Sequence, residues 1–203
     1  MGALGWWTLC LAALSVTVVC DVLLSAGVEP SRESARSLLQ KVAAIIQLAD
    51  QPARQPRQTT VTEHEVNSYL TFEAGAQIPA GVVEPSVTIV GDGRLSGRAV
   101  VDLDAVRKQN GQRSLFDPLS YITGRVAVTA TGVLRASNGV GHFELETAAI
   151  GPLPVPKLIL QEIVSYYSRT PARPSGITLD DPFTLPARIR EIVVQTGRAV
   201  VVQ

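Results

Sequence analysis

The hydrophobic and polar positions between Thr123 and Gln161 follow the pattern of a β-hairpin that leads into a helix. Apolar residues recur on one side of the first strand: Val126, Val128, Ala130 and Leu134. In the second strand apolar and polar positions alternate: Phe143 and Leu145 face one side, and His142, Glu144 and Glu146 face the other. A period of two residues is typical of a half-buried strand. Ser137-Asn138-Gly139 supplies the residues that tolerate the positive φ angles of a hairpin turn.

A second hairpin is predicted from Val82 to Val90 and from Arg94 to Asp104, around Gly91-Asp92-Gly93. In its second strand one face is apolar: Leu95, Gly97, Ala99, Val101 and Leu103. A polar connection is expected from Val106 to Tyr121. Four short strands are expected near the C-terminus: Ile177 to Leu179, Phe183 to Leu185, Ile189 to Gln195 and Arg198 to Gln203, the last two joined at Thr196-Gly197.

Two helices are expected before the hairpin that begins at Val82. Ser31 can cap a helix that runs to about Ala49, and Gln51 to Gln58 reads as a proline-containing linker. A helix from about Glu63 to Phe72 has a complete capping box, in which Thr62 and Glu65 exchange hydrogen bonds.

The first turn of that second helix carries His64 and Glu65, which together invite an acid–base interpretation. A capped turn that faces solvent explains the same two residues, and we favour this simpler interpretation.

The helix expected from about Val155 to Ser168 is apolar over most of its circumference. Its polar residues form one stripe: Lys157, Gln161, Ser165 and Ser168. A helix that rests on one face of a sheet needs an apolar arc of only about 100°. A second apolar surface must therefore contact this helix, and the first long helix, a subunit partner and lipid are the three candidates.

These elements predict an α+β fold, in which a long helix packs against a curved, mostly antiparallel sheet of hairpins. Residues 29–203 are expected to form a single domain, because the 203-residue chain has about the length of one domain once its apolar start is set aside.

Residues 2–28 are almost purely apolar, and Asp21 is their one charged residue. This length suffices for a helix to cross about 30 Å of hydrocarbon, or for a secretory signal. Trp6 and Trp7 suit the boundary between lipid headgroups and acyl chains. We expect an anchor in the inner membrane with the domain facing the periplasm, and an exported protein if the segment is cleaved.

Charge and cysteine content exclude several classes of function. Lysine and arginine together number 18, as do aspartate and glutamate, so the balanced charge gives no basic field for nucleic acid. Cys10 and Cys20 are the two cysteines and lie in the apolar start. The domain therefore has no disulfide, thiolate metal site or cysteine nucleophile, and we expect it to use no cofactor.

Candidate catalytic residues are few. Asp102 and Asp104 have the spacing of a cation or paired-carboxylate site, but the end of a solvated strand explains them better. His142 lies beside Glu144 on the polar side of its strand. The sequence contains no Gly-x-Ser-x-Gly elbow, phosphate-binding loop or His-Glu-x-x-His motif. We do not expect an enzyme.

The chain resembles small bacterial lipid-binding proteins of the tubular, TULIP-like kind, including LmeA-like phospholipid binders. The residues that carry this resemblance are the helix start with Thr62, Glu65 and Asn67, the aliphatic hairpins, the Leu153-Pro154-Val155-Pro156 turn before an apolar helix, and the late Leu185-Pro186. The resemblance implies a long helix cradled by a curved sheet, with an apolar groove for acyl chains.

We therefore expect a membrane-anchored, non-enzymatic protein that binds lipid or another apolar ligand in the cell envelope. The alternative is a structural or interaction module of an envelope assembly, with a protein partner. The expected ligand-binding residues come from the central hairpin and the apolar helix: Phe143, Leu145, Leu158, Ile159, Ile163, Tyr166 and Tyr167.

Overall fold

The computed structural model describes residues 29–49, 55–75, 77–79, 81–110, 124–169 and 174–203. The strands in this part of the chain are β1 (Gln58–Thr62), β2 (Val82–Gly91), β3 (Arg94–Asp102), β4 (Arg125–Ser137), β5 (Val140–Ile150), β6 (Leu153–Pro154), β7 (Phe183–Thr184), β8 (Glu191–Gln195) and β9 (Arg198–Val202). The helices are α1 (Arg32–Ala49), α2 (Glu63–Phe72), α3 (Leu103–Asn110) and α4 (Lys157–Tyr167).

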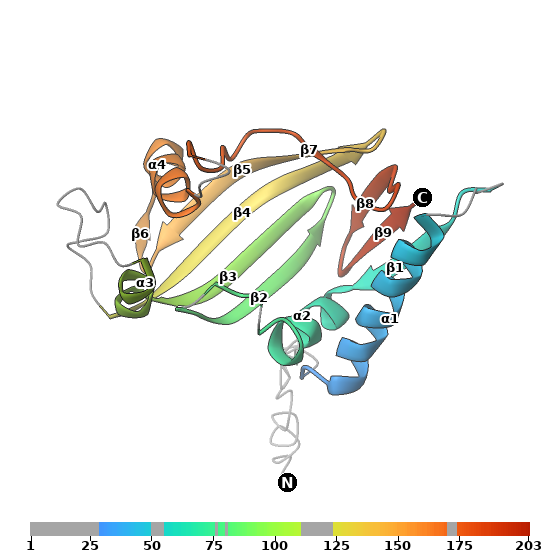
Figure 1. Cartoon of the computed structure of the whole chain (residues 1–203), viewed down its shortest axis with the longest axis horizontal. Helices are drawn as coiled ribbons and strands as arrows, with labels where there is room; N and C mark the ends of the chain where they lie inside the picture. Colours follow the sequence, from blue (N-terminus) through green and yellow to red (C-terminus); the bar gives the residue numbers. More distant parts are fainter. Residues whose placement is uncertain (1–28, 50–54, 76, 80, 111–123, 170–173) are drawn as a thin grey trace, which may run out of the picture.

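The strands form one open, curved, antiparallel sheet (Figure 1). Its main path runs β1-β9-β8-β4-β3-β2, and β5 pairs with the other edge of β4. The two short strands β6 and β7 pair with β5. The α+β prediction with a curved sheet of hairpins is therefore confirmed.

Both predicted hairpins are present with the expected turns. In the turn between β4 and β5, Asn138 has φ 52° and Gly139 has φ 80°, which is the left-handed geometry that such a short connection requires. The capping box of α2 is also confirmed, because the Thr62 side chain accepts from the Glu65 backbone N–H and the Glu65 carboxylate accepts from the Thr62 backbone N–H.

Two predicted connections and one predicted strand were wrong in part. The expected linker ends in β1, whose Thr- and Val-rich residues pair with β9. The polar connection begins as α3, because the Asp102 carboxylate accepts a hydrogen bond from the Ala105 N–H and caps this helix. The segment Ile177 to Leu179 is not a strand, since its backbone bonds to side chains of α4 instead of a neighbouring strand.

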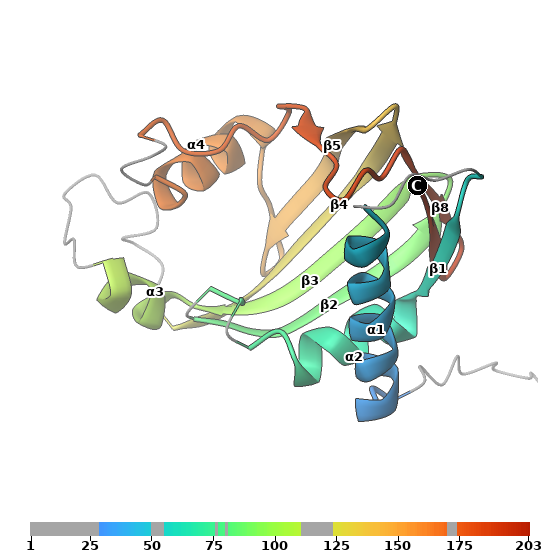
Figure 2. The same cartoon turned by 45° about the vertical axis from the view of Figure 1, so that its right-hand side comes forward.

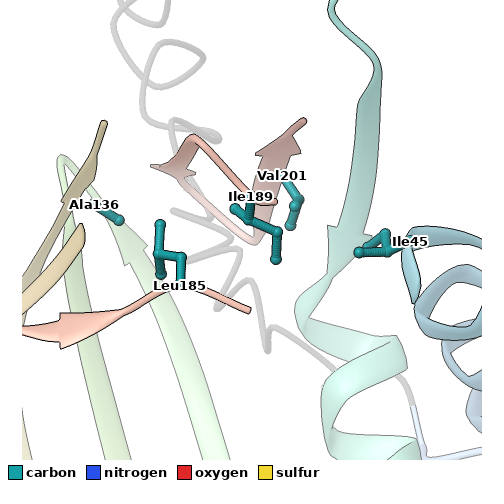
Figure 3. Close-up of a cluster of buried hydrophobic side chains, with 5 residues drawn as sticks. All are labelled: Ile45, Ala136, Leu185, Ile189 and Val201. Carbon is teal, nitrogen blue, oxygen red and sulfur yellow. The ribbon is translucent and has the colours of Figure 1, made fainter. Parts of the chain in front are cut away.

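The long helix α1 packs mainly on α2 and also contacts β1, at one end of the sheet (Figure 2). Its Ile45 contributes to a buried apolar cluster that joins four parts of the chain (Figure 3). The other members of this cluster are Ala136, Leu185, Ile189 and Val201. This cluster is therefore located where α1, β9, the turn end of β4 and the segment before β8 meet.

Helix α2 closes the free edge of β2 with side chains. The amide of Asn67 donates from Nδ2 to the Val87 carbonyl at 2.8 Å and accepts at Oδ1 from the Val87 N–H at 2.8 Å. The Glu63 carboxylate accepts from the Ile89 N–H at 2.7 Å. These bonds occupy backbone groups that would otherwise be available to pair with another strand.

Replacing Asn67 with Asp is expected to destabilise the domain by about 1–3 kcal/mol, because a carboxylate cannot donate to the Val87 carbonyl. Urea unfolding measures this change, and Thr71→Ala on the same helix provides a mild control, since Thr71 bonds only within α2. Equal stability of the wild type and Asn67→Asp would contradict the proposed role of the amide.

Within the described ranges, no helix is both long and apolar enough to span a membrane. The anchor or signal expected at residues 2–28 lies outside the described residues.

Candidate functional site

The register of β2 to β5 places apolar side chains on one face of the sheet. Val87, Gly97, Ala130 and Ala148 lie opposite one another across the four strands. Residues opposite one another in an antiparallel sheet point to the same side. The members of this apolar face are Val82, Val87, Ile89, Leu95, Gly97, Ala99, Val101, Val126, Val128, Ala130, Gly132, Leu134, Phe143, Leu145, Ala148 and Ile150.

The opposite face of the same strands is polar. It carries cross-strand ion pairs, with Arg135 2.6 Å from Glu144 and Arg94 2.8 Å from Glu146. The side chains of these pairs are substantially exposed, which shows that this face is in contact with solvent. Because they are exposed, the ion pairs contribute little to the stability of the fold. The sheet is thus clearly sided, with water on the polar face.

The apolar face lacks a complete covering layer among the described residues. A Cβ atom at Gly97, near the middle of this face, would have none of the described atoms within 4 Å. Most large apolar side chains around it, including Leu95, Val101 and Val128, are only half-buried. A soluble domain normally buries such a face against a second layer. The partial exposure of the apolar face makes this face the leading candidate for a binding surface.

Two phenylalanine rings cover glycines nearer the turn end of this face. The Phe143 ring occupies the space where a Gly132 side chain would project, and the Phe183 ring of β7 does the same at Gly141. Leu145, beside Phe143 on the same strand, is buried. The predicted site residues of β5 are therefore on the apolar face, with Phe143 half-buried and Leu145 in the core.

Helix α4 lies beside β5, whereas α1 lies at the other end of the molecule (Figures 1 and 2). The alternative in which the first long helix covers the apolar surplus of α4 is therefore wrong. Leu158 and Ile159 are 75% and 51% exposed. Ile163 and Tyr166 are half-buried, and the Tyr167 side chain lies outside the described part.

The polar stripe of α4 binds the segment that follows the helix. Gln161 donates to the Ile177 carbonyl at 3.0 Å and accepts from the Leu179 N–H at 2.8 Å. Ser168 accepts from the Ile177 N–H, and Lys157 lies 2.7 Å from Asp180. Because the following segment covers the polar stripe, apolar side chains of α4 remain in solvent.

Glu65 is buried, so its placement on a solvent-facing turn was wrong, and His64 is half-buried. The Glu65 carboxylate lies 2.7 Å from the Lys41 ammonium and accepts from the Ser37 hydroxyl at 2.6 Å. Burial alone raises the pKa of this carboxyl, but hydrogen bonds from Lys41, Ser37 and the Thr62 N–H, with the charge of Lys41, lower it to about 2. Glu65 is therefore an ionised residue that fastens α1 to α2.

The other candidate acids also have structural partners. Asp102 caps α3 at the end of its strand, and its bond from the Ala105 N–H, followed by its pairing with Arg125, lowers its pKa. Asp104 accepts from the Gly124 N–H at 3.2 Å, so it has a structural partner as well. In the part of the chain with described positions, no three His, Cys, Asp or Glu residues cluster as metal ligands do.

A hollow of about 560 Å³ lies between the turn end of β4 and the strand β8. It is widely open, and its lining combines apolar residues with charged ones such as Asp92, Arg135 and Glu191. Arg135 already pairs with Glu144. The mixed lining makes this hollow a weaker candidate for an apolar ligand than the apolar face.

Comparison of the sequence with protein-family models and with curated proteins finds no match.

Proposed function

We propose that this chain is a non-enzymatic, membrane-anchored protein that binds lipid or another apolar ligand in the cell envelope. The ligand contacts the apolar face of β2 to β5, with Phe143 at its turn end. The exposed and half-buried residues of α4 extend this surface beside β5: Leu158, Ile159, Ile163 and Tyr166. Membrane attachment is provided by the apolar segment 2–28.

The observation that carries the proposal is the open space over Gly97. Burying apolar surface stabilises a protein by about 25 cal/mol per Å², so a face left half-exposed retains free energy that a ligand can recover. An acyl chain offers only apolar surface and requires no polar group from the face. The apolar lining of this face therefore fits a lipid better than a polar metabolite.

The proposal departs from the tubular lipid-binding proteins in one respect. The resemblance of the chain to these proteins implies a long helix cradled by the sheet, whereas α1 packs mainly on α2 at the end of the sheet. The ligand surface proposed for this chain is therefore the sheet face and α4, and α1 is not part of it.

Replacing Gly97 with Leu tests the proposal, because the Cβ atom of the new side chain projects into open space, with none of the described atoms within 4 Å. The full chain is incorporated into liposomes that contain a phospholipid with a photoreactive acyl chain. Adducts on peptides of β3, β4 and β5 are expected to fall at least about tenfold in the variant, equivalent to about 1.4 kcal/mol. Adducts on residues 2–28 report membrane insertion and are expected to stay unchanged.

The matched control is Thr88→Leu, which adds an apolar side chain at an exposed position on the polar face. This control is expected to retain the sheet adducts. Absence of sheet adducts in the wild-type protein would contradict lipid binding, and cross-linking of this face to a protein would support the alternative interaction module. Sheet adducts that persist in Gly97→Leu would show that the ligand lies elsewhere.

A further inference from the structure

Helix α1 has both buried and exposed apolar side chains. Ala35, Leu38 and Ile45 are buried. Leu39, Val42 and Ile46 are 40%, 42% and 58% exposed. These three residues are spaced three and four apart, which places them on one side of the helix, and we call them the outer stripe.

The outer stripe continues into a basic helix start. Arg32 and Arg36 precede Leu39 by seven and three residues, so Arg32 lies in line with the stripe, Arg36 borders it, and both are exposed. The guanidinium of Arg32 also stacks on the Phe72 ring, 4.8 Å from its centroid. Glu33, the single acidic residue of α1, is offset from this side. An apolar stripe with arginines beside it is typical of helices that lie in the interface of an anionic bilayer.

The position of α1 in the chain favours the same partner. Only Glu29, Pro30 and Ser31 separate the apolar segment that ends at Val28 from the first residue of α1. A linker of three residues spans at most about 10 Å. A helix held this close to a membrane segment begins within the headgroup layer or directly above it.

We propose that the outer stripe of α1, with Arg32 and Arg36, docks on the surface of an anionic lipid bilayer. This inference rests on the membrane attachment in the proposed function, but it is independent of ligand binding by the sheet. Leu39, Val42 and Ile46 enter the boundary between headgroups and acyl chains, and the arginines contact lipid phosphates. Docking of α1 fixes the orientation of the whole domain on the membrane.

The proposal is tested with one tryptophan in the full chain. Replacing Trp6 and Trp7 with Phe removes both native tryptophans. Ile46→Trp then places a single fluorophore on the outer stripe, and Ala44→Trp places it at an exposed position about 160° around the helix. Each protein is reconstituted in liposomes of phosphatidylcholine and phosphatidylglycerol with brominated acyl chains, which quench tryptophan on contact.

Quenching is expected to be several-fold stronger for Ile46→Trp than for Ala44→Trp. Adding Arg36→Glu to the Ile46→Trp protein, or omitting phosphatidylglycerol, is expected to reduce this quenching. Equal quenching at the two positions, or none at either, would overturn the proposal. Protection of Ile46→Trp by a second copy or another protein, detected by cross-linking, would overturn it as well.

Two further measurements separate the possible failures. Flotation of the full chain with liposomes reports attachment through residues 2–28, whatever α1 does. The photoreactive-lipid adducts on the sheet report the proposed ligand surface, and they are expected to be unaffected by Arg36→Glu. Intact sheet adducts with no quenching at position 46 would overturn only the docking of α1, and the reverse result would overturn only ligand binding.

Discussion

Replacing Glu65 with Gln is expected to lower the free energy of unfolding by about 3 kcal/mol at neutral pH. An amide in this place loses the ion pair with Lys41 and accepts fewer hydrogen bonds from Ser37 and the Thr62 N–H. Urea unfolding at pH 7 measures the change. Glu144→Gln is the control, because its ion pair with Arg135 is exposed and should contribute far less.

The same carboxylate makes stability depend on pH. The folded-state pKa of Glu65 is about 2, below the ordinary value of 4.5 that the unfolded chain retains. The unfolded state therefore binds the proton first as pH falls, and the contribution of Glu65 is complete above about pH 4.5. That contribution is lost progressively as the pH falls from 4.5 to about 2. Glu65→Gln should show a shallower loss of stability over this interval, and parallel profiles would contradict the assignment.

Two glycines on the apolar face are expected to respond in opposite ways to alanine. A Cβ atom at Gly132 would lie 2.5 Å from the Glu144 carbonyl oxygen and 2.5 Å from the Phe143 ring. Backbone does not yield readily, so we expect Gly132→Ala to destabilise the domain by about 3 kcal/mol. Gly97→Ala meets open space and is expected to stabilise it by about 0.5–1 kcal/mol, because glycine weakens a strand.

Thermal unfolding of the two variants measures this difference. In a protein of this length, 1 kcal/mol corresponds to a shift in Tm of about 2–4 °C. Gly132→Ala should therefore melt roughly 10 °C below Gly97→Ala. Equal melting temperatures would mean that the apolar face is covered at both positions or at neither, which would remove the main support for a ligand surface at Gly97.

Local patterns predicted the hairpins and the cap of α2, because the residues that determine these features are neighbours in the chain. Asn138 and Gly139 permit a tight turn wherever they occur. Thr62 and Glu65 bond to each other within one helical turn. The alternation in β4 and β5 likewise identified the correct apolar positions, including Phe143 and Leu145.

Features that depend on distant partners could not be predicted in this way. Glu65 is buried because Ser37 and Lys41 approach it from α1, and nothing in the sequence around α2 indicates their presence. The strand β1 is only five residues long, and its partner β9 lies near the other end of the sequence. Predicting the apolar face would have required knowledge of the register of four strands, including the shift between Thr131 and Gly132.

The pairing of β1 with β9 also affects the order in which the chain can fold. β1 follows α1 directly, whereas its partner is synthesised last among the strands. Contacts between residues so far apart in sequence form slowly, because a long loop must close first. The end of the sheet that supports α1 therefore cannot be completed until β9 has been made.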